Sequence, residues 1–174
     1  SDDVPRVAGK NASLGEMISA LKKEGVRVPG GFATTAQAYR TFVDANDIEE
    51  QMESLLSDWK NDDKTLQETG EGIRRLFRHG AFPNEIDQAI RNAYRELSER
   101  YDRNEVDVAA RSSATAEDLP EASFAGQQES FLNVTGEDDL LDACRNCYAS
   151  LFTDRAITYR EEQGFDHIKV ALSV

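Results

Sequence analysis

The segment from residue 111 to residue 129 contains the side chains with the clearest potential for chemistry in this sequence. It is long, contains few apolar residues, and is rich in hydroxyl groups, small side chains and backbone N–H groups. Arg111 stands at its start, directly after the apolar run 106–110. An arginine fork beside a loop of Ser, Thr, Ala and Gly can hold a polyphosphate, and loops longer than about twelve residues are usually functional or disordered. Because apolar segments flank this one on both sides, we interpret it as functional.

Lys10 is a second candidate for contact with phosphate. The pair Gly9-Lys10 does not belong to a P-loop, which would need glycine where Val4 stands and Ser or Thr where Asn11 stands. Lys10 nevertheless precedes a helix with a predicted cap, and a helix N-terminus favours an anion. Taken alone, Lys10 fits an ordinary exposed lysine better. Gly126 is open to two readings in the same way, because it could relieve a turn or permit close approach of the backbone to a phosphate.

The other candidates for chemistry are weaker. His79 and His167 lie in polar surroundings without an apparent partner, so we expect both at the surface. Cys144 and Cys147 have the spacing of a redox pair or of half a zinc site. Both fall on an apolar helical stripe, and no second cysteine pair completes a metal site, so we predict that they pack in the core. The acidic pair 117–118 could position a metal or cap a turn, and the turn is favoured.

Composition limits the possible classes of protein. The 174 residues carry a net charge of −13, which argues against a general nucleic-acid or membrane-surface binder because both need a positive field. No apolar run approaches the ~20 residues of a membrane span and no signal-peptide pattern opens the chain, so we expect a cytoplasmic protein. Eight carboxylates face a single lysine within residues 44–63, and we interpret them as a solvated helical face: Asp44, Asp47, Glu49, Glu50, Glu53, Asp58, Asp62 and Asp63.

The periodicity of apolar residues predicts an α+β fold rich in helix. Helices are expected over residues 13–25, from Thr34 or Thr35 with Tyr39, Phe42 and Val43 inward, around 52–59 and 66–77, from Pro83 with Ile86, Ala89, Ile90, Ala93 and Leu97 on one face, and over 136–151 and 153–163. Strands are expected over 106–110 and 131–134 with a polar loop between them, and alternation predicts a half-buried strand over 168–174. Because that strand runs to the last residue, we expect the chain to be part of a longer polypeptide.

Four collinear segments carry a resemblance to a known family. They are residues 9–17, 28–35, 111–120 with 122–134, and 150–156 with 159–160. Together they resemble the nucleotide-binding N-terminal region of the pyruvate phosphate dikinase and phosphoenolpyruvate-utilising family, within it most closely the pyruvate, water dikinases, also called phosphoenolpyruvate synthases. Ala8 stands where the family tends to have a second glycine.

The resemblance implies an ATP-grasp unit that clamps ATP between two lobes. Residues 1–174 would form the truncated N-terminal lobe with a small mixed or antiparallel sheet, in which 1–105 is mostly helical and 106–174 is a strand–loop–helix part that carries the phosphate loop. By matching motifs, Lys10 and Arg111 should contact the ATP phosphates, with Arg111 acting in catalysis. Gly126 and Ser130 should lie on the loop that closes over them.

The resemblance also implies a reaction. Enzymes of this kind transfer the β-phosphoryl group of ATP to a histidine on a swivelling domain of the same polypeptide, release the γ-phosphate as inorganic phosphate and leave AMP. The phosphohistidine then phosphorylates pyruvate, which gives phosphoenolpyruvate. The Mg²⁺ ligands and the phospho-accepting histidine are expected downstream of residue 174, so no metal ligand is assigned here, and residues 1–174 alone should be inactive.

Three alternatives remain open at this stage. Rifampin phosphotransferase resembles the same region and shares the dikinase chemistry. Pyruvate, phosphate dikinase is disfavoured because the sequence of its corresponding loop differs from residues 112–120 of this chain. A nucleotide-binding module without catalysis is an alternative of another class.

Overall fold

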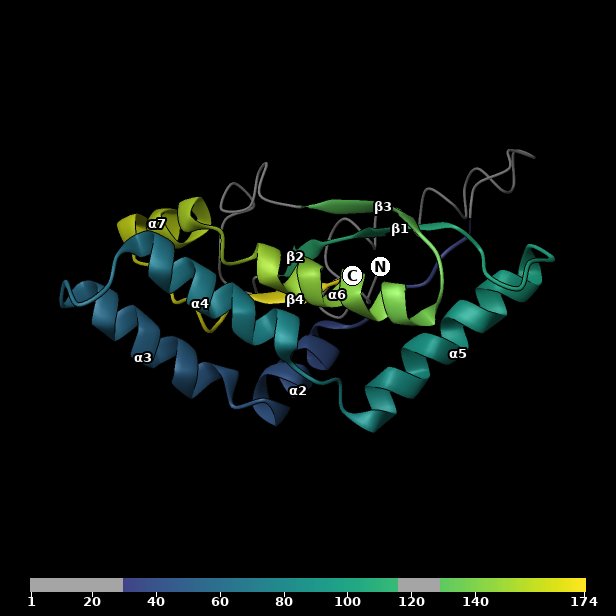
Figure 1. The fold of residues 1–174 in the computed structure, drawn as a ribbon, viewed down its shortest axis with the longest axis horizontal. Coiled ribbons are helices and arrows are strands. Elements are labelled where there is room, and N and C mark those ends of the chain that lie inside the picture. Colours follow the sequence, from purple (N-terminus) through teal and green to yellow (C-terminus); the bar gives the residue numbers. More distant parts are fainter. Residues whose placement is uncertain (1–29, 116–128) are drawn as a thin grey trace.

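The computed structural model describes residues 30–115 and 129–174, and helices dominate this part of the chain (Figure 1). The helices that precede the first strand are α2 Ala36–Ala45, α3 Ile48–Lys60, α4 Leu66–His79 and α5 Asn84–Arg100. They are followed by β1 Val108–Arg111, β2 Ser113–Thr115, β3 Ser130–Val134, α6 Glu137–Ser150, α7 Asp154–Gln163 and β4 Ala171–Ser173. The α+β class predicted from the sequence is confirmed. The helix expected over 13–25 lies outside the described residues.

Threonine caps explain where several helices begin. The Thr35 hydroxyl accepts a hydrogen bond from the first turn of α2, and Thr153 does the same for α7. Thr65 and Glu68 form a reciprocal capping box at the start of α4. A hydroxyl at this position satisfies a backbone N–H that has no partner inside the helix. The prediction that Thr34 or Thr35 caps a helix is therefore confirmed, and Thr35 is the cap.

Helices α4 and α6 are at the centre of the packing. Figure 1 shows α3 and α4 side by side at one end of the molecule and α5 at the other. Helix α4 packs against α3, α6 and α7, whereas α5 packs against α6. Aromatic side chains fill the space between α2, α4 and α6: the Phe42 and Tyr148 ring centroids are 5.3 Å apart, and those of Phe77 and Phe152 are 5.1 Å apart. Large rings buried in this way contribute much of a core's stability.

The described strands form two antiparallel pairs. β1 pairs with β3, and β2 pairs with β4. The first pair packs on α6, and β4 packs against α2. Thr34, just before α2, donates its backbone N–H to the Val174 carbonyl at 2.8 Å and accepts a hydrogen bond from the Val174 N–H at 3.0 Å. The start of the described chain is thereby joined to its last residue.

The strands differ from the prediction in three places. β1 begins at Val108 and includes Arg111. Residues 113–115, which we expected in the polar loop, form β2 because their backbone pairs with β4. The last strand covers only Ala171–Ser173 and is not half-buried, since Val170 through Ser173 are all buried. The polar position in this alternation is Ser173, which lies inward and donates its hydroxyl to the Thr34 carbonyl.

Helix α5 buries Ile90 and Leu97 as predicted, with Ile86 packed against the core, but its buried face also includes residues that the prediction left out. Pro83 is its N-cap, and Ala89 is exposed. The buried side chains are Ile90, Tyr94, Leu97 and Ser98. The prediction used apolar residues alone, whereas the structure turns Tyr94 and Ser98 inward because each makes hydrogen bonds with the chain around the strands.

Candidate functional site

Arg111 and Ser130 are direct neighbours across the β1–β3 pair. Arg111 ends β1, Ser130 begins β3, and their Cα atoms are partners in the antiparallel register. Both residues are exposed. In such a pair, directly opposite residues have Cβ atoms about 4.5–5.5 Å apart. Two of the four residues predicted to bind ATP are therefore brought together at one position.

The alternation of strand residues turns Arg111 toward solvent. Ala110 and Val134 are buried on the face that packs on α6, and successive side chains of a strand point to opposite faces. The next residue, Ser112, is buried and donates both its N–H and its hydroxyl to the Glu129 carbonyl, at 3.3 and 3.4 Å. Ser112 and Glu129 thus hold together the two ends of the predicted phosphate loop, directly beside Arg111.

The Arg111 guanidinium is available to bind an anion. Within residues 30–115 and 129–174 it has no ion pair and no hydrogen-bond acceptor, whereas Arg74, Arg91 and Arg145 each contact a carboxylate. The protein carries a net charge of −13, and Arg111 is one of several exposed arginines without a carboxylate partner among the described residues, so its place in the β1–β3 pair is what sets it apart. A guanidinium fork can bind phosphate oxygens in a bidentate manner. The geometry at Arg111 and Ser130 suits a phosphate group.

Lys10 and Gly126, the other two predicted ATP-binding residues, lie outside the described residues, and so does the acidic pair 117–118. Their assignments stay predictions.

The sequence analysis did not single out Leu132, whose side chain is 64% exposed. It lies two residues after Ser130 in β3, where alternation places it on the same face as Ser130 and Arg111.

The register of the β1–β3 pair shifts between Val108 and Ala110, and Asn133 on the partner strand has a φ of 55°. A bulge re-aims neighbouring side chains and often occurs beside functional sites. The sequence did contain one sign of this bulge: an asparagine, a residue that tolerates left-handed backbone, within a predicted strand.

His167 was expected at the surface, and this prediction is wrong. Its side chain is buried and lies between Arg160 and Glu161. The Arg160 Nε–H donates to His167 Nδ1 at 3.0 Å, so the ring proton lies on Nε2, which is 2.9 Å from Glu161 Oε1. Burial and the Arg160 charge lower the pKa of His167, which is therefore neutral near pH 7. His79, by contrast, is exposed as predicted.

Arg160 is itself fully buried, 1% exposed. It donates to the Leu151 carbonyl and to His167, and it lies over the Phe152 ring with its guanidinium carbon 5.1 Å from the centroid. Burial lowers the pKa of Arg160 to about 10, which leaves it cationic at neutral pH. These contacts join the end of α6 to α7 and to the chain before β4, so Arg160 is part of the framework.

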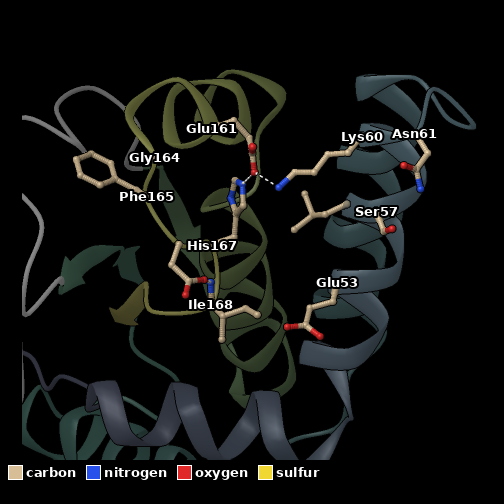
Figure 2. A pocket seen from close by; sticks show the side chains of 11 residues that line it. Glu53, Ser57, Lys60, Asn61, Glu161, Gly164, Phe165, His167 and Ile168 are labelled. Atoms are coloured by element: carbon tan, nitrogen blue, oxygen red, sulfur yellow. Dashed lines mark hydrogen bonds and ion pairs between the residues drawn. The ribbon is translucent and has the colours of Figure 1, made fainter.

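A cleft of about 580 Å³ lies between α3 and the connection from α7 to β4. Figure 2 shows Lys60 reaching from α3 toward Glu161 of α7, with His167 on the other side of the same carboxylate. The Lys60 Nζ to Glu161 Oε1 distance is 2.8 Å. Burial would raise the pKa of Glu161, but the hydrogen bonds from Lys60 and His167 outweigh it and lower that pKa. Among the described residues, no three His, Cys, Asp or Glu side chains come together to hold a metal ion.

The cysteines pack in the core, as predicted. Cys144 and Cys147 are buried and free. Burial raises the pKa of Cys144 to about 12 and raises that of Cys147 further. A thiol held in this way is a poor nucleophile and a poor metal ligand at neutral pH.

The acidic residues within 44–63 are on the surface, which agrees with a solvated helical face. Seven of the eight carboxylates are exposed, and Asp58 is half-buried and paired with Lys64. In the part of the chain that the structure describes, no helix is long and apolar enough to cross a membrane.

Comparison with known proteins gives consistent matches over nearly the whole chain. A family model described as "Pyruvate phosphate dikinase, AMP/ATP-binding domain" matches residues 4–174. The phosphoenolpyruvate synthase of Aquifex aeolicus is 53% identical over 174 residues, which cover 99% of this chain and 20% of that protein. The phosphoenolpyruvate synthase of Synechocystis sp. is 55% identical over 177 residues, and that of Escherichia coli (strain K12) is 53% identical over 173 residues; each match covers 99% of this chain and 22% of the relative. The chain thus spans about a fifth of the length of the curated relatives it matches.

Proposed function

Because this chain belongs to the pyruvate phosphate dikinase AMP/ATP-binding domain family, we propose that it is the ATP-binding lobe of a pyruvate, water dikinase. The full-length enzyme would convert ATP, pyruvate and water into AMP, phosphoenolpyruvate and inorganic phosphate. The observation that carries the proposal is that exposed Arg111, which has no partner side chain among the described residues, lies opposite Ser130 in the β1–β3 register, beside the Ser112–Glu129 hydrogen bonds. That arrangement offers a fork and a hydroxyl to a polyphosphate.

In the proposed reaction, the lobe holds the triphosphate while its β-phosphoryl group moves to a histidine on a swivelling domain of the same polypeptide. The Arg111 fork binds phosphate oxygens and stabilises the charge that shifts during transfer. Ser130 donates its hydroxyl from the neighbouring strand. Lys10 supplies a point charge, and backbone N–H groups around Gly126 close over the phosphates. The γ-phosphate joins water and leaves as inorganic phosphate.

Magnesium would neutralise part of the phosphate charge when bound with ATP. Its ligands are proposed to lie downstream of residue 174, together with the rest of an ATP-grasp fold, the phosphohistidine and the pyruvate-binding barrel. We also place the enzyme in the cytoplasm.

The test follows the phosphorus atoms of ATP through the reaction of the full-length protein. With pyruvate and Mg²⁺, label at the β-phosphorus should appear in phosphoenolpyruvate, label at the γ-phosphorus should appear in inorganic phosphate, and AMP should form in equal amount. A simple kinase would instead move the γ-label to the acceptor and leave ADP.

The same assay separates the alternatives. A requirement for added phosphate, with release of pyrophosphate, would identify a pyruvate, phosphate dikinase. Turnover with rifampin in place of pyruvate would identify an antibiotic phosphotransferase. ATP binding without AMP formation under any of these conditions would contradict catalysis and leave a nucleotide-binding module.

A further inference from the structure

The Tyr94 hydroxyl joins the two chain segments that flank the β1–β3 pair. It donates to the Val106 carbonyl at 2.7 Å, two residues before β1, and accepts from the Gly136 N–H at 2.9 Å, two residues after β3. Tyr94 is 1% exposed and lies on the inward face of α5. The Tyr94 hydroxyl oxygen therefore binds both the residue that leads into β1 and the residue that follows β3.

Neighbouring contacts reinforce this attachment to α5. The Ser98 hydroxyl accepts from the Val106 N–H at 3.1 Å, so both backbone groups of Val106 are bound by α5. Glu137, directly after Gly136, pairs with Arg91 at 3.1 Å and with Arg95 at 3.0 Å. These ion pairs fix the start of α6 on the same helix.

The β1–β3 pair is short, so its geometry depends on the contacts around it: α6 covers one face, Ser112 and Glu129 close the end beside Arg111, and α5 holds the other end. The pair contains only four and five residues in its two strands, and its register is interrupted between Val108 and Ala110. A two-stranded ribbon is marginally stable on its own, and a bulge interrupts its hydrogen bonds. The position of Arg111 therefore depends on both ends of the pair: the Ser112–Glu129 hydrogen bonds beside it and the attachment of the other end to α5.

We propose that Tyr94 is a positioning residue for the phosphate site, acting through β1 and β3 on Arg111 and Ser130. This inference rests on the proposed function of that site. Arg111 is the fifth residue after Val106 along an extended segment, and at about 3.3 Å per residue the two are about 17 Å apart. Tyr94 cannot touch the nucleotide, and its effect is on the spacing and tilt of the two strands. A misplacement of 1 Å far from the chemistry can lower a rate by up to about 10²-fold.

The test is a double-mutant cycle in the full-length enzyme, with AMP formation and ATP affinity as readouts. Tyr94→Phe removes only the hydroxyl, and kcat/KM for ATP should fall about tenfold while the fold is retained, as judged by circular dichroism. Arg111→Ala should then cost less in the Tyr94→Phe background than in the wild type, because the guanidinium is already misplaced. A role confined to stability would leave the two effects multiplicative.

Tyr148→Phe is the matched control, because this buried tyrosine hydroxyl has no hydrogen-bond partner within the described residues. It should leave both kcat/KM and the effect of Arg111→Ala unchanged. If Tyr94→Phe fails to fold, Ser98→Ala removes one contact to Val106 and should show the same coupling at smaller size.

The outcomes separate this inference from the proposed function. A strong effect of Arg111→Ala that is fully multiplicative with Tyr94→Phe overturns the positioning role and leaves the phosphate site intact. An Arg111→Ala enzyme with wild-type activity overturns the phosphate site itself.

Discussion

Replacement of Arg111 provides the most direct test of the phosphate site, because the structure separates its effect on activity from its effect on stability. The side chain is exposed and has no ion pair or hydrogen bond among the described residues. Substitutions at such positions change the free energy of unfolding by at most about 0.5 kcal/mol. Loss of one preorganised contact to transition-state charge lowers kcat by about 10²–10³, equivalent to about 2.7–4 kcal/mol. Arg111→Ala should therefore nearly abolish turnover in a normally folded protein.

Arg111→Lys separates charge from geometry. Lysine retains the positive charge but loses the planar fork, so it cannot bind two oxygens in a bidentate manner. We expect it to recover only a small part of the lost rate. An activity close to that of the wild type would show that the site needs charge alone.

The assay is single-turnover formation of AMP from ATP by the full-length enzyme, with ATP affinity and thermal unfolding measured on the same preparations. Arg103→Ala is the matched control: Arg103 is also exposed and has no ion pair within the described ranges, but it follows α5, outside the β1–β3 pair. It should leave turnover unchanged. Wild-type turnover by Arg111→Ala would refute the phosphate site, and a large fall in its unfolding temperature would show a structural role instead.

Three further predictions concern the framework and use unfolding of the full-length protein as the readout. Gly80→Ala should destabilise by about 1–2 kcal/mol, because overpacking of a core costs about 1–3 kcal/mol and the new Cβ would clash with Cζ of the buried Phe42 ring. Gly31→Ala, where a Cβ would have nothing within 4 Å, is the control, and equal stability of the two variants would contradict the reasoning. Arg160→Ala should destabilise by about 3 kcal/mol, because it leaves two buried acceptors without a donor, and a loss below about 1 kcal/mol would refute its framework role. Burial holds the pKa of His167 below its ordinary value, so as the pH falls the unfolded chain binds a proton at this histidine before the folded chain does. The wild type should therefore lose stability relative to His167→Gln below about pH 6.5. Parallel profiles of stability against pH for the two proteins would disprove this.

Much of the helical framework could be predicted from the sequence because its signals are local. The spacing of Tyr39, Phe42 and Val43 gave the inward face of α2, and threonine marked its first turn. Apolar flanks likewise predicted β1 and β3. The prediction worked where a side chain's neighbours in sequence are also its neighbours in space.

The errors occurred where partners are distant or where polar groups satisfy one another in the interior. His167 is a polar residue in a polar stretch of sequence, and its burial depends on Arg160, seven residues earlier in α7. β2 was missed because its partner strand lies more than fifty residues later. Tyr94 was missed because an aromatic residue on a helical stripe gives no sign of two backbone partners on either side of a distant strand pair.

The β1–β3 pair divides binding and support between its two ends. The end at Arg111 and Ser130 is exposed, and its guanidinium has no ion pair in the part of the chain that the structure describes, whereas the end at Val106 and Gly136 is held on α5 by a buried hydroxyl. A binding group must remain free of internal partners to bind its ligand, so its orientation has to come from elsewhere in the chain. In this molecule the binding residues and the residues that orient them lie at opposite ends of the same strand pair. Substitutions at the exposed end should therefore lower turnover at constant stability, and substitutions at the fastened end should lower both.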